Sequence, residues 1–151
     1  MIVVVMGVSG CGKSTVGRAL ADAMGWPFFD ADDHHPEANI RKMSNGIPLT
    51  DADRLPWLER LRAVLAHEES EGRSAVLACS ALKESYRARL RQASPDVRFV
   101  FLRGTPDEIR LLMSRRTGHF MKPGMLDSQF AALEEPRDAL IIPVSLPCAE
   151  Q

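Results

Sequence analysis

The segment from Gly7 to Ser14, GVSGCGKS, has the residue types and spacing of a phosphate-binding loop. Its glycines let the backbone curl so that several N–H groups point at phosphate oxygens. The Lys13 ammonium would reach the β- and γ-phosphates of a nucleotide, and the Ser14 hydroxyl would ligate Mg²⁺. We therefore predict a nucleotide and Mg²⁺ site formed by Gly7, Val8, Ser9, Gly10, Cys11, Gly12, Lys13, Ser14 and Thr15.

The same residues permit one competing interpretation, because the stretch from Val8 to Cys11 also looks like the cleavage site of a bacterial lipoprotein. A secretory leader needs a positively charged start and an apolar core of about 7–15 residues. No charge precedes Lys13, and the apolar run at 2–6 is shorter than that range. We therefore expect the chain to begin with a buried strand that leads into the phosphate loop.

Two acids, Asp30 and Asp32, follow a short apolar run that predicts a second strand. In an extended segment, residues i and i+2 point to the same side. We expect both carboxylates at the carboxyl edge of the sheet, where ligands bind. One acid of such a pair can hold Mg²⁺ through water while the other accepts a proton from an attacking hydroxyl. The alternative is an acidic loop that only caps the helix after Pro36.

Four cations accompany the acid pair: Lys42, Arg54, Lys83 and Arg87, of which the last two are i,i+4 neighbours on one helix face. Each alone is equally explained as a solvated surface charge. As a group near a phosphate loop they suit an anionic substrate, and arginine can bind a carboxylate through two parallel hydrogen bonds. His35 could hydrogen-bond a polyol; the alternative is an ordinary loop histidine.

Arg115 and Arg116 end a predicted helix and open a loop that contains Gly118. Phosphoryl transfer needs cations over the transferring group, and a mobile lid can bring them. We expect a lid at about 115–127. Alternatively, these arginines only complement the helix C-terminal dipole.

Apolar runs alternate with helical stretches along the chain, which predicts an α/β P-loop fold: a three-layer sandwich with a five-stranded parallel sheet and helices on both faces. One domain over 1–151 fits the length.

Thr105 begins a capping box with Glu108, and Gly25 falls where a helix C-cap is expected. Residues 146–151 resemble the first turn of a helix, so we expect the helix that would cover the last strand to be missing. Either the chain is truncated there, or a neighbouring surface or subunit covers that face. The expected strands are 2–6, 28–30, 75–79, 98–102 and 139–145, and the expected helices are 14–24, 53–71, 83–92 and 106–116.

Composition excludes several classes of protein. A net charge of −1 gives no general basic excess for nucleic acid, and no stretch approaches the ~20 apolar residues of a membrane span. Cys11, Cys79 and Cys148 are far apart and lack metal-ligand spacing, which favours reduced cytosolic thiols. The run at 75–79 ends without a carboxylate, which argues against motor proteins and switch GTPases, because these carry an acidic Mg²⁺ partner there.

Further blocks, in a fixed order after the phosphate loop, resemble the gluconate kinases (gluconokinases), in the shikimate-kinase-like branch of the P-loop small-molecule kinases. The resemblance extends over nearly the whole chain. The blocks are DADDHHP at 30–36, NIRKM at 39–43, GIPLTDADR at 46–54, PWL at 56–58, ACSALK at 78–83, GHFM at 118–121 and SQFAALEEP at 128–136.

This resemblance implies ATP-dependent phosphorylation of D-gluconate at its 6-hydroxyl, with Mg²⁺, by a cytoplasmic and homodimeric enzyme. It implies that Asp32 is the base, that Asp30 helps to hold Mg²⁺, and that Arg116 is a lid arginine that acts with Lys13. Two alternatives stay open: a kinase for another hydroxy acid such as shikimate, or a nucleotide-binding module that has lost catalysis, because Leu112 stands where the family usually has a second lid arginine. The expected substrate residues, within a segment at about 31–58 and beyond it, are Asp32, His35, Lys42, Arg54, Ser80, Lys83, Arg87 and His119.

Overall fold

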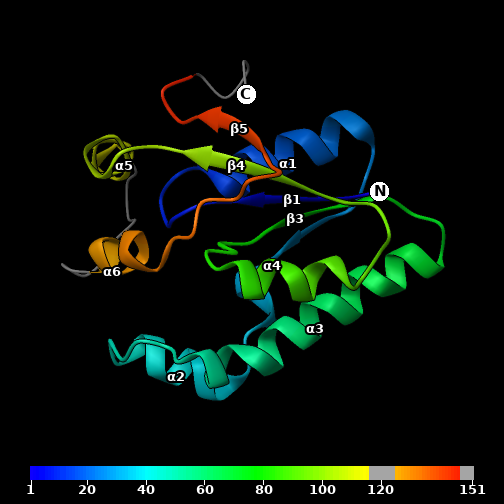
Figure 1. Ribbon diagram of the computed structural model, residues 1–151, viewed down its shortest axis with the longest axis horizontal. Helices are drawn as coiled ribbons and strands as arrows, with labels where there is room; N and C mark the ends of the chain where they lie inside the picture. Colours follow the sequence, from blue (N-terminus) through cyan, green and yellow to red (C-terminus); the bar gives the residue numbers. More distant parts are fainter. Residues whose placement is uncertain (116–124, 147–151) are drawn as a thin grey trace.

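The computed structural model describes residues 1–115 and 125–146 of the 151-residue chain. The described strands and helices follow one another as the sequence predicts, except that the helices at 37–44 and 125–132 were not among those expected. A 3-10 helix (η1) follows the second strand (Figure 1). In chain order the elements are β1 (Ile2–Met6), α1 (Lys13–Met24), β2 (Phe28–Asp30), η1 (Ala31–His34), α2 (Glu37–Ser44), α3 (Asp51–Ser70), β3 (Ala75–Ala78), α4 (Glu84–Arg91), β4 (Val97–Arg103), α5 (Pro106–Ser114), α6 (Met125–Ala132) and β5 (Leu140–Pro143).

Within the described residues, the strands form one parallel sheet of five in the order β2-β3-β1-β4-β5. β1 lies at the centre: Ile2 is in register with Ala75 of β3 on one side and with Val97 of β4 on the other. All residues of β1 are buried, because helices cover both faces of such a sheet. The predicted five-stranded parallel sheet is confirmed, and the carboxyl ends of its strands meet at one edge.

Alternate residues of β1 point to opposite faces of the sheet and build two separate cores. Ile2 and Met6 belong to a core with α3 and α4, whereas Val3 and Val5 belong to a core with α1 and α5. Figure 1 shows the corresponding layers, with α1 on one side of the sheet and α3 and α4 on the other. The predicted three-layer sandwich is therefore confirmed.

Capping residues set the helix boundaries next to the site. The predicted capping box is present: the Thr105 hydroxyl accepts the Glu108 N–H, and the Glu108 carboxylate accepts the Thr105 N–H. A second capping box joins Thr50 to Asp53. Because Thr50 caps the helix, α3 begins at Asp51, two residues before the expected start.

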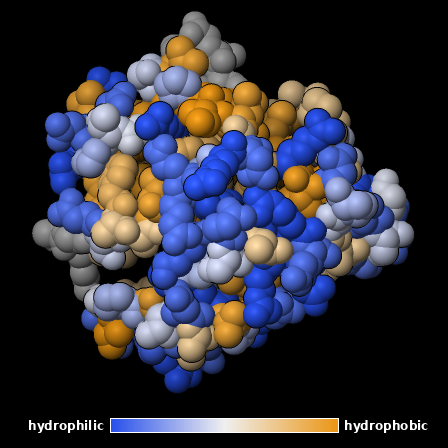
Figure 2. Space-filling view, in the orientation of Figure 1, coloured by the Kyte–Doolittle hydropathy of each residue, from blue (hydrophilic) through white to orange (hydrophobic). Residues whose placement is uncertain are grey.

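The surface over α3 and α4 is mostly hydrophilic, whereas apolar surface gathers over β5 (Figure 2). Leu140 and Ile141 of β5 are 64% and 47% exposed. Among the helices that the structure describes, none has the length and apolar character needed to span a membrane. The first helical turn predicted at 146–151 lies outside the described residues except for Leu146.

Candidate active site

The phosphate loop, residues 7–12, connects the central strand β1 to α1 and depends on glycine at two sharp positions. Gly7 has φ +149°, and a Cβ there would lie 2.9 Å from the Leu102 carbonyl oxygen. Gly10 has φ +82°, and its Cβ would lie 2.5 Å from Cγ of Met113. A side chain at Gly7 would collide with backbone, and one at Gly10 would push the Met113 side chain aside. Both positions also have a positive φ that favours glycine, so the glycine spacing follows from this backbone path.

The N-terminus of α1 opens directly from this loop. Within the described residues, no side chain caps the helix, and its first turn carries no acid. The first N–H groups of a helix have no partner within the helix and attract anions. Lys13 is the first helical residue, and its ammonium donates to the Val8 carbonyl oxygen at 2.9 Å. A lysine ammonium and unpaired N–H groups therefore meet at the predicted phosphate site.

The acid pair lies beside the first turn of α1. The Ser14 hydroxyl donates to Oδ2 of Asp30 at 2.9 Å, and the other Asp30 oxygen accepts the Asp32 N–H at 3.0 Å. The expectation that Asp32 continues an extended strand is wrong, because Asp30 ends β2 and caps η1, in which Asp32 lies. The two acids nevertheless remain close enough to influence each other's charge.

The environment of Asp32 makes its carboxylate more basic than an ordinary aspartate. Burial raises the pKa of Asp32, the negative charge of Asp30 raises it further, and the Lys13 ammonium partly opposes both effects. A carboxylate with a raised pKa is a better proton acceptor, provided that it is ionised at the working pH.

Ser14 and Asp30 offer the hydroxyl and carboxylate oxygens that Mg²⁺ prefers. No group of three or more His, Cys, Asp or Glu side chains within residues 1–115 and 125–146 is placed to hold a metal ion. Mg²⁺ usually takes one or two protein ligands and completes its shell with water and substrate phosphates. The donor set therefore fits Mg²⁺ that arrives together with a nucleotide.

A buried aromatic pair supports the segment that carries Asp32. The Trp57 indole donates to the Ala31 carbonyl oxygen at 2.7 Å, and the His35 ring stacks on Trp57 with centroids 4.4 Å apart. The amide nitrogen of Asn39 donates to the Asp53 carbonyl oxygen at 2.9 Å, which fixes the orientation of that amide. These contacts place His35, a predicted substrate residue, next to the Asp32 segment.

His35 carries no charge at neutral pH. Burial lowers its pKa to about 4, and the nearby Arg54 guanidinium contributes to the shift. Nδ1 lies 3.3 Å from the Asn39 amide nitrogen, which can only donate, so the ring proton resides on Nε2. A neutral imidazole with an Nε2–H can donate a hydrogen bond to a hydroxyl group.

The other predicted substrate-binding cations near His35, namely Lys42, Arg54 and Lys83, all have hydrogen-bond or ion-pair partners within the protein. Lys42 donates to the Asp53 carboxylate at 2.8 Å, and this contact, with the Thr50 N–H, lowers the Asp53 pKa to about 2. Arg54 donates to the Leu49 carbonyl oxygen and to the Tyr86 hydroxyl. Lys83 pairs with Asp51 at 3.1 Å.

Two residues that were predicted to bind substrate contact other parts of the protein at the loop after β3: Ser80 lies in this loop, and Arg87 donates to it. The Ser80 carbonyl oxygen accepts the Gly7 N–H at 3.3 Å, which connects this loop to the phosphate loop. Arg87 is only 1% exposed in its side chain. It donates to the carbonyl oxygens of Ala81 and Glu134, both at 2.7 Å. Ala81 has φ +45°, a conformation that is strained for a residue with a side chain, and Arg87 helps to hold it.

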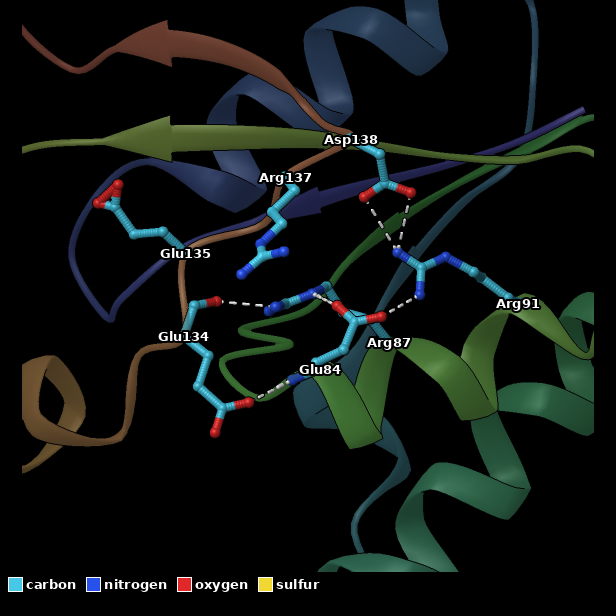
Figure 3. Close-up of a pocket in the computed structure, with 7 residues that line it drawn as sticks. All are labelled: Glu84, Arg87, Arg91, Glu134, Glu135, Arg137 and Asp138. Carbon is cyan, nitrogen blue, oxygen red and sulfur yellow. Dashed lines mark hydrogen bonds and ion pairs between the residues drawn. The ribbon is translucent and has the colours of Figure 1, made fainter.

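The shared helix face expected for Lys83 and Arg87 does not bring them to one site. Lys83 precedes the first residue of α4, whereas Arg87 turns toward Glu84 and the segment after α6 (Figure 3). A cavity of about 520 Å³ lies there. Its lining residues pair largely with one another and include none from the phosphate loop: Glu84, Arg87, Arg91, Glu134, Glu135, Arg137 and Asp138.

Gln129 of α6 contacts the phosphate loop, although no spacing in the sequence indicates it. Its side-chain oxygen accepts the Ser9 N–H at 2.6 Å, and its nitrogen donates to the Ser9 hydroxyl at 2.7 Å. These residues are 120 positions apart, so only the fold could reveal the pair. Trp57 and Asn39 were missed as supporting residues for the same reason.

The predicted lid is only partly described. Arg116 and His119 lie outside the described residues, whereas Arg115 ends α5 and Leu112 packs against the core on the α1 side of the sheet. At the other end of the segment, Asp127 pairs with Arg110 at 3.0 Å.

Comparison with known proteins finds similar chains over most of this sequence. The family model described as shikimate kinase matches residues 9–141. The chain is 50% identical over 135 residues to a gluconokinase of Gluconobacter oxydans, covering 89% of this chain and 76% of the relative. It is 48% identical over 134 residues to the thermosensitive gluconokinase of Escherichia coli, covering 89% and 72%. A crystal structure of a gluconokinase from Sinorhizobium meliloti matches with a TM-score of 0.90 and 49% identity, covering 98% of this chain and 85% of that one.

Proposed function

Since the chain belongs to the gluconokinase family, we propose that it transfers the γ-phosphoryl group of ATP to the 6-hydroxyl of D-gluconate. The products are 6-phospho-D-gluconate and ADP. The observation that supports this proposal is the surroundings of Asp32: its N–H donates to Asp30, Asp30 accepts from Ser14 at the start of α1, and burial raises the pKa of the Asp32 carboxyl.

The proposed reaction relies on positioning and charge stabilisation. The 6-hydroxyl oxygen bonds to the γ-phosphorus, the bond from that phosphorus to the bridging oxygen breaks, and ADP leaves with the electron pair. Asp32 accepts the hydroxyl proton. Lys13 and the N–H groups at the start of α1 stabilise the negative charge on the phosphates.

Ser14 and Asp30 are the residues that would hold Mg²⁺. When bound, Mg²⁺ supplies charge neutralisation at the β- and γ-phosphate oxygens. We also propose that residues 115–127 form a lid that contributes Arg116 and His119. Residues 31–58 would bind the acceptor.

For the acceptor, we propose that His35 donates to a hydroxyl group while Arg54 and Lys83 bind the carboxylate. Their cationic groups lie on the α3 and α4 side of the site. Lys42 and Arg87 would act indirectly, because Lys42 pairs with the capping residue Asp53 and Arg87 holds two backbone carbonyl groups.

The deciding experiment measures ADP release from MgATP with D-gluconate and with shikimate as separate acceptors. Release that depends on gluconate supports the proposal, and release with shikimate alone would make the chain a kinase for another hydroxy acid. ATP binding without release in either case would indicate a nucleotide-binding module. 6-Deoxy-D-gluconate tests the position of transfer, because it lacks the proposed nucleophile and should give no turnover.

We further propose a homodimer in the cytoplasm, which the family resemblance supports. Light scattering of the purified chain tests the assembly: a monomer at micromolar concentration would overturn that part. Fractionation of the source cells tests the location.

A further inference from the structure

The cations that we assign to the acceptor's carboxylate already bind a carboxylate of the protein itself. Asp51, the first residue of α3, accepts from the Lys83 ammonium at 3.1 Å through Oδ1 and at 3.3 Å through Oδ2. The Tyr86 hydroxyl also donates to Oδ1. These hydrogen bonds lower the Asp51 pKa, with that from Tyr86 first, so the carboxylate is ionised at neutral pH.

Arg54 completes this group of donors. Its Nη1 lies 3.2 Å from the Tyr86 hydroxyl and 3.8 Å from Oδ1 of Asp51. The donors come from the N-terminal turns of α3 and α4, where helix dipoles favour a negative charge. Two cations and one hydroxyl therefore surround a single carboxylate.

This group is connected to the reacting end of the proposed site. Lys83 lies three residues after Ser80, whose carbonyl oxygen accepts the Gly7 N–H of the phosphate loop. Arg54 is close enough to His35 for its charge to lower the pKa of that ring. His35 in turn stacks on Trp57, which holds the residue before Asp32. Polar groups thus extend from the proposed base to the donors around Asp51.

The donors are held more firmly than the carboxylate that they bind. Tyr86 is 7% exposed, and the Arg54 and Lys83 side chains are about one-third exposed. The Asp51 side chain is 66% exposed, and ion pairs of such exposed groups contribute little stability. Another carboxylate can therefore replace Asp51 at small cost while the donors stay in place.

We propose that Asp51 is a specificity-determining residue that occupies the position of the acceptor's carboxylate and is exchanged for it when the acceptor binds. This inference rests on the proposed function and narrows the acceptor class to polyols with a carboxylate opposite the phosphorylated hydroxyl. A neutral polyol has no charge to replace Asp51 and leaves the carboxylate on its donors. The exchange thus selects sugar acids over sugar alcohols of the same length.

The test is Asp51→Asn, which keeps the size of the side chain and removes its charge. We expect the KM for D-gluconate to fall three- to tenfold with kcat within twofold, because the acceptor no longer competes with an internal carboxylate. The preference for D-gluconate over the neutral polyol D-glucitol should narrow, because the KM for D-glucitol falls further once the site no longer holds a carboxylate that a neutral polyol cannot replace. Lys83→Gln should act in the opposite direction and raise the KM for gluconate, leaving the KM for MgATP unchanged.

Asp107→Asn is the matched control, since Asp107 is an exposed acid in the first turn of α5 that pairs with Arg110. It should leave both acceptor KM values unchanged. An unchanged or raised KM for gluconate in Asp51→Asn, with an unaltered melting temperature, would overturn the exchange.

If the wild-type chain shows no gluconate-dependent ADP release, the proposed function fails. Calorimetric titration of both chains with gluconate then still decides the exchange, because tighter binding to the variant supports it and equal or weaker binding refutes it.

Discussion

The phosphate loop and the acceptor side of the site are built in different ways. The phosphate loop is one run of consecutive residues that offers backbone N–H groups and a single ammonium group. The acceptor side consists of side chains from η1, α2, α3 and α4, which hold one another through hydrogen bonds and stacking. Local geometry therefore suffices for the first region, whereas the second depends on how separate elements pack.

The largest effect should come from Asp32, where the two regions meet. Asp32→Asn removes the proposed base but keeps the size of the side chain, and turnover should fall about 100- to 10,000-fold. MgATP binding should weaken only modestly, as measured by calorimetry. In the wild-type chain, kcat should fall as the pH drops through the raised Asp32 pKa, because the protonated acid cannot accept a proton. Full activity in Asp32→Asn would remove this residue from the base role.

Arg87 tests the packing on which the acceptor side depends. Arg87→Met leaves the carbonyl oxygens of Ala81 and Glu134 without their donor. The free energy of unfolding should fall by about 3 kcal/mol, because breaking a buried charged network is costly. Chemical denaturation measures the change. Arg89→Met is the matched control: Arg89 forms a half-exposed pair with Glu59, and the loss of that pair should cost under ~1 kcal/mol.

Acid should weaken the acceptor side through His35. The folded-state pKa of about 4 lies below the ordinary value of 6.5, so the unfolded chain binds more protons between these values. This contribution to stability is complete above about pH 6.5 and disappears toward pH 4, a loss on the order of 3 kcal/mol. Denaturation across that pH range measures it. His35→Asn should flatten this part of the pH profile, whereas substitution of the exposed His67 by Gln should not.

The smallest expected effect tests whether the phosphate loop depends on contacts from a distant element, here Gln129 of α6. Gln129→Leu removes both hydrogen bonds to Ser9, and each ordinary hydrogen bond contributes about 1 kcal/mol. The KM for MgATP should rise about three- to tenfold, while the KM for gluconate stays within twofold. Ser9→Ala, which keeps the backbone contact, should give a smaller increase. Equal KM values for MgATP in Gln129→Leu and the wild type would show that Gln129 only packs α6.

The sequence predicted the fold and the phosphate loop well because both depend on local patterns. Apolar runs indicated the strands, and Thr105 marked the start of α5. The sequence also indicated that Asp32 follows β2, but it predicted an extended conformation there and not the 3-10 helix that the structure has. Spacing could not distinguish Lys83 from Arg87, since burial of the second depends on Glu134, which is 47 residues away. Long-range pairs of this kind have no signature in a single sequence.

The central position of β1 has a consequence for the order in which the protein matures during synthesis. The ribosome releases β1 and the phosphate loop first, yet both strands that flank β1 are made much later, at Ala75–Ala78 and Val97–Arg103. A nascent chain that ends with α3 contains the whole nucleotide-binding motif without either neighbour of its strand. Such distant pairing is slow and leaves apolar segments exposed. Nucleotide can therefore favour the folded chain only after synthesis has passed Arg103, when β4 completes the centre of the sheet.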